Sequence, residues 1–174
     1  SELYRKHPDW CIHAPGRRRS LCRNQLTLDL SREDVRQYII KCLDDVLSNV
    51  KISYVKWDMN RHMSNLGSAM LPPERQRELP HRYMLGLYEI MEEVTQTHPN
   101  VLFESCSGGG GRFDAGMLYY MPQIWTSDDT DPIERLYIQY GTSLVYPVSA
   151  MGAHVSAIPN HQSGRKTPLA TRGC

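Results

Sequence analysis

The stretch YVKWDMNR, residues 54–61, places one carboxylate at the end of a short run of β-branched and aromatic residues. Lys56 stands two positions before Asp58, so both side chains point to the same face of an extended strand. An ammonium group beside a carboxylate favours its ionised form, which a nucleophile requires. A Lys–Asp pair that only fixes the start of a loop explains the same residues. The pattern leaves both interpretations of Asp58 open.

A second acidic group lies in WTSDDTD, residues 125–131. Crowded carboxylates disfavour one another's ionisation, so one of them can stay protonated near neutral pH. A protonated carboxyl near an ionised one is the apparatus of glycoside hydrolysis. Asp131 has a simpler explanation, because an aspartate before Pro132 is typical of a helix N-cap, whereas Asp128 and Asp129 have no such evident duty. The segment lacks the glycine and distal glutamate of an EF-hand calcium loop.

Four consecutive glycines, Gly108 to Gly111, occur in ESCSGGGGRFD. They let the backbone approach a ligand closely, and a tight turn beside a sugar fits them. A phosphate-binding loop fits poorly, because no Lys-Ser or Lys-Thr follows. Cys106, just before them, is either a thiol nucleophile or a small residue in the wall of a pocket. No histidine is evidently paired with it.

Other residue types narrow the chemistry further. The seven histidines show no spacing typical of zinc ligands, so we expect no metal and no cofactor. Tyr54, Trp57 and Trp125 flank the acids. Aromatic rings beside carboxylates suit stacking on the apolar face of a sugar, although such residues more often belong to a core.

Alternating strands and helices must position these groups. Period-two apolar residues and β-branched runs predict the strands, and apolar residues at helical spacing predict the helices, the first of them capped by Ser31. We expect strands at 26–31, 52–59, 100–106 and 123–127, and helices at 32–49, 81–97, 114–121 and from Pro132 onward. This order predicts a parallel sheet with crossover helices, in which Asp58, Cys106 and Asp128 lie at the C-terminal ends of strands. An α/β barrel and a doubly wound open sheet both use that edge for chemistry.

The overall composition indicates a soluble globular protein without a strongly charged partner. The 174 residues suffice for one domain, and 20 basic residues against 19 acidic ones give a net charge of +1. We therefore expect neither nucleic acid nor a membrane as a partner. The five cysteines are odd in number and lack C-x-x-C spacing, which favours a reducing cytosol.

Taken together, the longer motifs resemble glycoside hydrolase family 36, the large microbial α-galactosidases. They are YVKWDMNRHMS, LFESCSGGGGRFDAGMLYYMPQIWTSDDTDPIERLYIQYGTSLVYP and SAMGAHVSAIPNHQSGRKTPLATRG, with HPDWCIHAPGR and RNQLTLDLSREDV in support. The resemblance covers essentially the whole chain. It implies a (β/α)8 barrel and a double-displacement mechanism that retains the anomeric configuration and acts on melibiose or raffinose-type oligosaccharides.

The resemblance also implies roles for individual residues. Asp58 matches the nucleophile, and Asp128 matches the general acid/base, with Asp129 as its immediate competitor. Lys56 matches a residue that hydrogen-bonds galactose. Three further positions match the substrate side of the family's pocket. They are Cys106, Gly109 and Arg23, the last of which lies in CRNQ. The family usually has a glycine at the position of Cys22, the residue before Arg23.

Chains of this family are several times longer, so residues 1–174 are expected to form one partial catalytic domain, roughly the C-terminal half of the barrel. The N-terminal β-sandwich, the first barrel strands and the C-terminal β domain are not represented in it. The parent protein is expected to be a homo-oligomer, by family habit a tetramer. Two alternatives stay open: galactosyl transfer to another sugar by a raffinose-synthase-like enzyme, and a truncated chain without catalytic activity.

Overall fold

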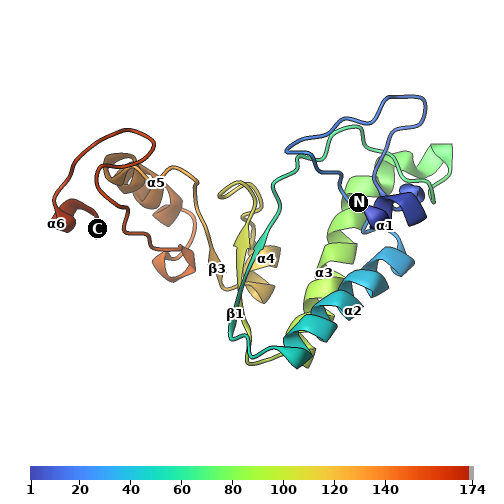
Figure 1. Cartoon of the computed structure of the whole chain (residues 1–174), viewed down its shortest axis with the longest axis horizontal. Helices are drawn as coiled ribbons and strands as arrows, with labels where there is room; N and C mark the ends of the chain where they lie inside the picture. Colours follow the sequence, from blue (N-terminus) through green and yellow to red (C-terminus); the bar gives the residue numbers. More distant parts are fainter. Residues whose placement is uncertain (173–174) are drawn as a thin grey trace. The chain divides into compact units, whose positions relative to one another are not determined.

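The computed structural model describes residues 1–172, and the chain divides into two compact units (Figure 1). The helical unit comprises residues 1–53 and 60–101. The sheet unit comprises residues 54–59 and the chain from residue 102 onward.

The helical unit is built on two helices, α2 (Glu33–Asn49) and α3 (Leu79–Thr97), which lie side by side (Figure 1). Gly86 lets α3 approach the backbone of Leu30 closely, because a Cβ at this position would lie 2.0 Å from the carbonyl oxygen of Leu30. The buried apolar residues of the two helices are Val35, Ile40, Leu79, Tyr83, Leu87, Ile90, Met91 and Val94. The shorter elements are α1 (Glu2–Lys6), η1 (Pro8–Trp10) and η2 (Pro73–Glu78).

The sheet unit contains three parallel strands in the order β1 (Tyr54–Asp58), β2 (Leu102–Cys106) and β3 (Gln123–Ile124). Phe103, Cys106 and Ile124 are buried in it. Its other elements are α4 (Ala115–Tyr120), α5 (Pro132–Ser143), η3 (Val148–Ala150) and α6 (Leu169–Arg172). The predicted mixed α/β class with parallel strands is therefore confirmed.

One predicted strand is wrong. Residues 26–31 do not form a strand, and Leu28 makes only an isolated antiparallel bridge to Cys11. The reason lies in Asp29, which is buried and accepts hydrogen bonds from the Ser31 backbone N–H and hydroxyl at 3.0 and 2.6 Å. This Asx turn bends the chain before α2 and ends the extended segment.

The same turn overturns the predicted N-cap of α2. The Ser31 hydroxyl is used by Asp29, and the helix begins at Glu33 after Arg32, whose side chain makes no capping hydrogen bond. Asp34 strengthens this end of the helix instead, by accepting from the Val35 backbone N–H at 3.0 Å.

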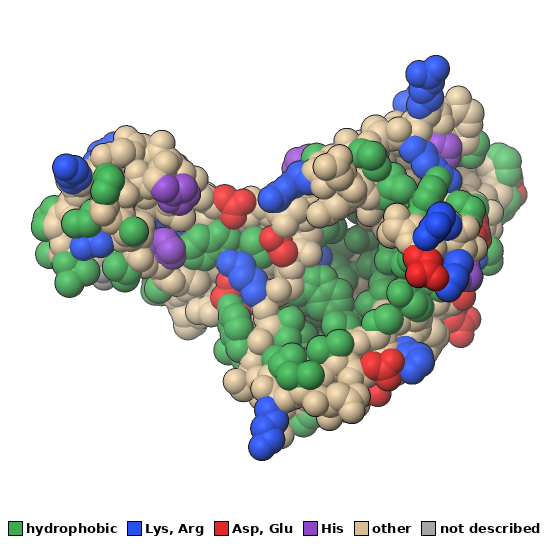
Figure 2. All heavy atoms as spheres, viewed as in Figure 1, with side chains coloured by type: hydrophobic (Ala, Val, Ile, Leu, Met, Phe, Trp, Pro, Cys, Tyr) green, Lys and Arg blue, Asp and Glu red, His purple; other side chains and the backbone are tan. Residues whose placement is uncertain are grey.

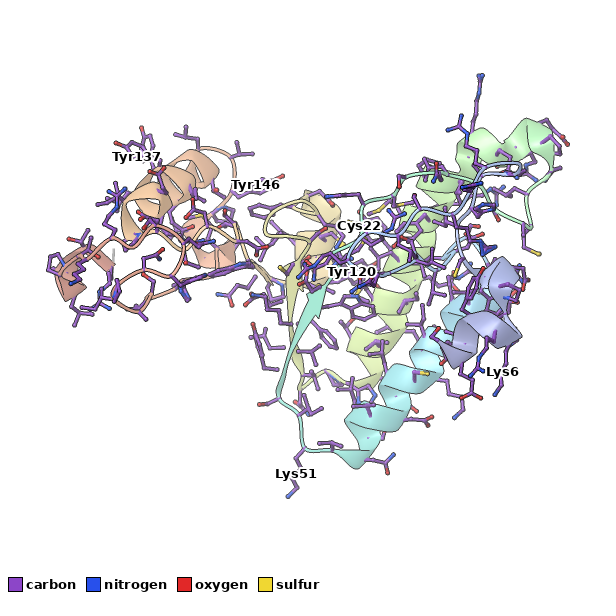
Figure 3. All side chains as sticks on the ribbon, turned by 45° about the horizontal axis from the view of Figure 1, so that its top comes forward. Lys6, Cys22, Lys51, Tyr120, Tyr137 and Tyr146 are labelled. Atoms are coloured by element: carbon purple, nitrogen blue, oxygen red, sulfur yellow. The ribbon has the colours of Figure 1, made fainter. Side chains whose placement is uncertain are left out.

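The apolar side of α5 is correctly spaced but is not buried. Leu136, Tyr137 and Tyr140 are 41, 71 and 69% exposed. Figure 3 shows Tyr137 projecting from α5, and Figure 2 shows hydrophobic side chains on the visible surface of the C-terminal part of the chain. The helix is anchored by Asp131, which caps it by accepting from two backbone N–H groups, and by the buried Arg135. The predicted capping role of Asp131 is confirmed.

Candidate active site

The candidate site lies where the three parallel strands of the sheet unit end. Asp58 is the last residue of β1 and pairs in register with Cys106, the last residue of β2. Asp128 lies in the loop that follows β3. The predicted positions of Asp58 and Cys106 at strand ends are confirmed, and parallel strands end at one edge of the sheet. Asp128 follows β3 by four residues, because this strand ends at Ile124 and not at the predicted residue 127.

The Cys106 thiol is a partner of Asp58 and has the character of a buried, protonated group. Burial raises its pKa, and the hydrogen bond to the Asp58 carboxylate raises it further, although the Gly109 backbone N–H acts in the opposite direction. A nucleophilic cysteine needs a lowered pKa, since the thiolate is the reactive form. The raised pKa and the burial of the thiol therefore favour Cys106 as a wall residue beside Asp58.

Lys56 lies on the same side of β1 as Asp58 and contacts two groups. Its Nζ is 3.3 Å from Glu104 Oε1 and 4.4 Å from the centroid of the Trp125 ring. Glu104 is buried and also accepts from the Tyr54 hydroxyl. Burial and this hydrogen bond raise the pKa of Tyr54 to about 12, so the hydroxyl remains a donor at neutral pH. The Lys56 side chain is 39% exposed, which leaves its ammonium accessible to a ligand.

The three aspartates after β3 have different surroundings. Asp128 is exposed, and its Oδ1 accepts from Trp125 Nε1 at 3.0 Å. Asp129 Oδ1 accepts from the Asp131 backbone N–H at 2.9 Å, which is an Asx turn. Asp131 caps α5 and forms an ion pair with Arg165 at 3.0 Å. The hydrogen bond from Ser163 holds the pKa of Asp131 below its usual value, with the α5 backbone N–H groups in support.

Arg135, which the sequence analysis did not identify, fixes the backbone of this loop. It is 5% exposed and donates to the carbonyl oxygens of Ser127 and Asp129 at 2.9 and 3.3 Å. Its guanidinium carbon lies 4.6 Å from the centroid of the Trp125 ring. Gln162 holds the loop from another segment, by donating to the Asp128 carbonyl oxygen at 3.0 Å. Both residues lie inside the longer motifs that resemble the family, but no residue type or spacing there indicated that they hold this loop.

The glycine loop packs directly against the loop that carries Asp128. Gly109 has φ +87°, and a Cβ on it would lie 2.7 Å from Ser127 Cα and 3.0 Å from the Asp128 backbone nitrogen. The glycine is therefore required both by its own conformation and by its neighbour. Figure 3 shows Tyr146 reaching toward this region, where its ring stacks on Phe113 at 3.9 Å.

Arg23 belongs to the helical unit. It has φ +52° and lies in the turn closed by a backbone hydrogen bond from Gln25 to Cys22 at 3.0 Å. Its side chain is exposed. Its predicted role on the substrate side stays a prediction.

Two further observations concern metals and membranes. Within residues 1–172, no group of three or more His, Cys, Asp or Glu side chains is arranged to hold a metal ion. None of the helices in this part of the chain has the length and apolar character needed to span a bilayer.

Comparison with known proteins places these features in a family. The family model described as Melibiase matches residues 1–174. The α-galactosidase AgaA of Geobacillus stearothermophilus is 71% identical over 173 residues, which are 99% of this chain and 24% of AgaA. α-Galactosidase 1 of Pediococcus pentosaceus is 59% identical over 172 residues, again 99% of this chain and 24% of the relative. The chain thus spans about a quarter of the length of these curated relatives.

Solved structures agree with the sequence comparison. The crystal structure of GH36 α-galactosidase AgaA matches with a TM-score of 0.96. The match covers 99% of this chain and 24% of the AgaA chain. Two variants of AgaA match with the same coverage, 70% identity and TM-scores of 0.96 and 0.95. One has an aspartate replaced by asparagine and is in complex with raffinose, and the other has an aspartate replaced by alanine and is in complex with stachyose. The chain belongs to the melibiase family and groups with the GH36 α-galactosidases.

Proposed function

We propose that this chain carries the catalytic carboxylates of a retaining α-galactosidase, which removes terminal α-linked galactose from oligosaccharides of the raffinose and stachyose type. In this proposal Asp58 is the nucleophile and Asp128 is the general acid/base. The three parallel strands belong to the C-terminal half of a (β/α)8 barrel, whose remaining strands lie outside residues 1–174. A cytosolic location and a homo-oligomeric parent stay predictions of the sequence.

The position of Asp58 supports the role of nucleophile. It is the last residue of β1, and its partner in the strand register is Cys106, the last residue of β2. A nucleophile in a double displacement must be ionised and aimed at the anomeric carbon, and both requirements fit a carboxylate held at the end of a strand.

The surroundings of the two adjacent aspartates support Asp128 over Asp129 as the acid/base. Asp129 is engaged in the turn that leads to α5, through its bond to the Asp131 backbone N–H. Asp128 is exposed and is not part of that turn. An independent observation agrees: in AgaA the aspartates replaced in the raffinose and stachyose complexes are as many residues apart as Asp58 and Asp128 are here. This equal spacing is the observation that carries the proposal.

The proposed reaction has two steps. Asp58 attacks C1 of galactose while the bond from C1 to the leaving oxygen breaks and Asp128 gives that oxygen its proton. The product is a β-galactosyl ester of Asp58. Asp128, now ionised, then takes a proton from the water that attacks C1 and frees Asp58. Two inversions retain the α configuration, and the two carboxyl groups should lie about 5–5.5 Å apart.

The remaining site residues bind the sugar in this proposal. The Lys56 ammonium, which Glu104 and Trp125 hold in place, donates to galactose hydroxyls. Cys106 and Gly109 form the wall of the pocket next to the nucleophile. Arg23 keeps its proposed place on the substrate side.

Azide rescue tests both assignments in the native protein that contains this sequence. Asp58→Ala and Asp128→Ala should each lower kcat/KM for raffinose, by on the order of 10³-fold or more. With an activated α-galactoside, azide should enter the space left by Asp58 and give β-galactosyl azide by one inversion. In Asp128→Ala, azide should attack the galactosyl ester from the other face and give α-galactosyl azide.

Asp129→Ala is the matched control and should keep most of the activity. Exchange of the two azide anomers between the variants would reverse the assigned roles. If Asp129→Ala, and not Asp128→Ala, gave the α-anomer, the acid/base would be Asp129. Absence of hydrolysis by the unmodified protein would leave the non-catalytic alternative as the better description.

A further inference from the structure

We infer that Trp125 is a positioning residue for Asp128: its indole N–H holds Oδ1, so that Oδ2 is the oxygen that exchanges the proton. The inference rests on the proposed function, in which Asp128 is the general acid/base. It gives Trp125 a role different from the two that the sequence suggested, sugar stacking and core packing.

The hydrogen bond supplies the orientation that a general acid needs. Trp125 Nε1 lies 3.0 Å from Asp128 Oδ1. An exposed aspartate otherwise samples several rotamers, and its carboxyl rotates readily about the last torsion. Proton transfer requires the donor oxygen to lie within hydrogen-bond reach of the leaving oxygen. The N–H group on Oδ1 fixes the plane of the carboxyl group. Because this hydrogen bond occupies Oδ1, the transferred proton is carried by Oδ2.

The indole is itself held by cations from two different elements. Lys56 Nζ from β1 and the Arg135 guanidinium from α5 lie 4.4 and 4.6 Å from its ring centroid. Cations over an indole are attracted by the negative face of the ring, most strongly where water is partly excluded. His154 adds an edge contact at 5.3 Å. Because cations occupy positions at which a sugar ring would stack, the contacts favour a positioning role over a stacking platform.

This arrangement couples the segments that carry the two carboxylates. Lys56 stands two residues before Asp58 on one strand, and Arg135 fixes the backbone of the loop with Asp128. Trp125 contacts both cations and donates to Asp128. The orientation of the acid/base therefore depends on a ring that also contacts the Lys56 side chain of the nucleophile's own strand.

Trp125→Phe in the native protein that contains this sequence tests the inference. The variant keeps an aromatic ring for the cations and removes the N–H donor. We compare kcat/KM for raffinose, whose leaving oxygen must be protonated, with kcat/KM for dinitrophenyl α-galactoside, whose leaving group departs as an anion. General acid catalysis contributes about 10²–10⁴-fold, so partial misalignment should lower the raffinose value roughly 10- to 100-fold. The dinitrophenyl value should stay within about threefold, because no proton is needed for that departure.

Trp10→Phe is the matched control. Trp10 Nε1 donates to Asp34 Oδ2 at 3.1 Å in the helical unit, so this variant loses the same type of bond. It should leave the ratio of the two kcat/KM values unchanged. If Trp125→Phe is poorly folded by circular dichroism, replacement of the Trp125 indole by its benzothienyl isostere removes the N–H with almost no change in shape.

The outcomes separate this inference from the proposed function. An equal loss on both substrates, or no loss on either, in Trp125→Phe would overturn the positioning role. Asp128→Ala measured in parallel should show the largest split between the substrates. If Asp128→Ala shows the split and the Trp125 variants do not, only the inference fails. If Asp128→Ala shows no split, the assignment of the acid/base fails first.

Discussion

Each unit of the molecule contains a tryptophan that donates its indole N–H to an aspartate. In the helical unit the pair is Trp10 and Asp34, at 3.1 Å. In the sheet unit it is Trp125 and Asp128, at 3.0 Å. The two hydrogen bonds are alike in type and length, but the groups around the two carboxylates differ.

The Asp34 carboxylate is fixed by a charged partner. Arg32 donates to both of its oxygens, from Nε at 2.9 Å and from Nη2 at 2.8 Å. This hydrogen bonding, with that from the Val35 backbone and Trp10, holds the pKa of Asp34 below its usual range. A carboxylate paired in this way stays ionised and serves the structure, here the start of α2.

Asp128 is fixed by the loop that carries it and by Trp125. The nearby cations contact the Trp125 ring and the backbone of the loop, whereas the Asp128 carboxylate itself accepts a hydrogen bond from an uncharged indole N–H. A bidentate arginine stabilises the ionised form so strongly that proton exchange becomes difficult. A carboxyl group that must exchange a proton is therefore better fixed indirectly, through its loop and one neutral N–H.

The largest effect is expected from replacing Arg135, which is buried. Arg135→Met removes the donors to the carbonyl oxygens of Ser127 and Asp129 and should destabilise the sheet unit by about 2–4 kcal/mol, because partly buried acceptors lose their partner. It should also lower kcat/KM for raffinose by roughly 100-fold or more. Chemical denaturation and steady-state kinetics measure the two effects.

Arg36→Met is the control in the helical unit, where Arg36 donates to the carbonyl oxygens of Leu30 and Ser31 at 3.1 Å each. It should lower stability without changing the preference between raffinose and dinitrophenyl α-galactoside. A change of that preference in Arg36→Met, or an unchanged kcat/KM for raffinose in Arg135→Met, would contradict the distinction between a structural arginine and a functional one.

A substitution in the glycine loop should have an intermediate effect on stability and activity. Gly109→Ala places a Cβ 2.7 Å from Ser127 Cα, so the loop with Asp128 must move. We expect a loss of about 1–3 kcal/mol in stability and of roughly tenfold in kcat/KM for raffinose.

Gly108→Ala is the matched control, because Gly108 also has a positive φ, +56°, but a Cβ there meets nothing within 4 Å. This variant carries the backbone strain without the displacement of Ser127. Equal activity losses in Gly108→Ala and Gly109→Ala would show that strain, and not contact with the Asp128 loop, limits the reaction.

The smallest expected effect is on acid stability. The Ser163 hydroxyl is the main cause of the lowered pKa of Asp131, whose usual value is 3.8. A lowered pKa in the folded state contributes stability above the unfolded value and loses it as the pH falls through the folded value. Ser163→Ala should raise the folded pKa toward 3.8, so the sheet unit should begin to unfold at a slightly higher pH. Acid titration followed by circular dichroism measures the shift, and an unchanged midpoint would exclude this role of Ser163.

Several features could be predicted from the sequence because their causes are local. The β-branched run before Asp58 specifies a strand that ends at that carboxylate, and the aspartate before Pro132 specifies a helix start. Parallel order then brings strand ends together. The prediction failed at residues 26–31, because alternating leucines do not form a strand when an Asx turn at Asp29 bends the chain.

The sequence by itself determined the residue types at the edge of the sheet and the family to which the chain is similar. Only the tertiary structure decided which acids are engaged and by what. Trp125 reaches Asp128 from only three residues away along the chain, whereas Arg135 and Gln162 reach the loop from a helix and from a distant segment. Such contacts depend on where separate segments meet in space, and no periodicity or local propensity encodes that meeting.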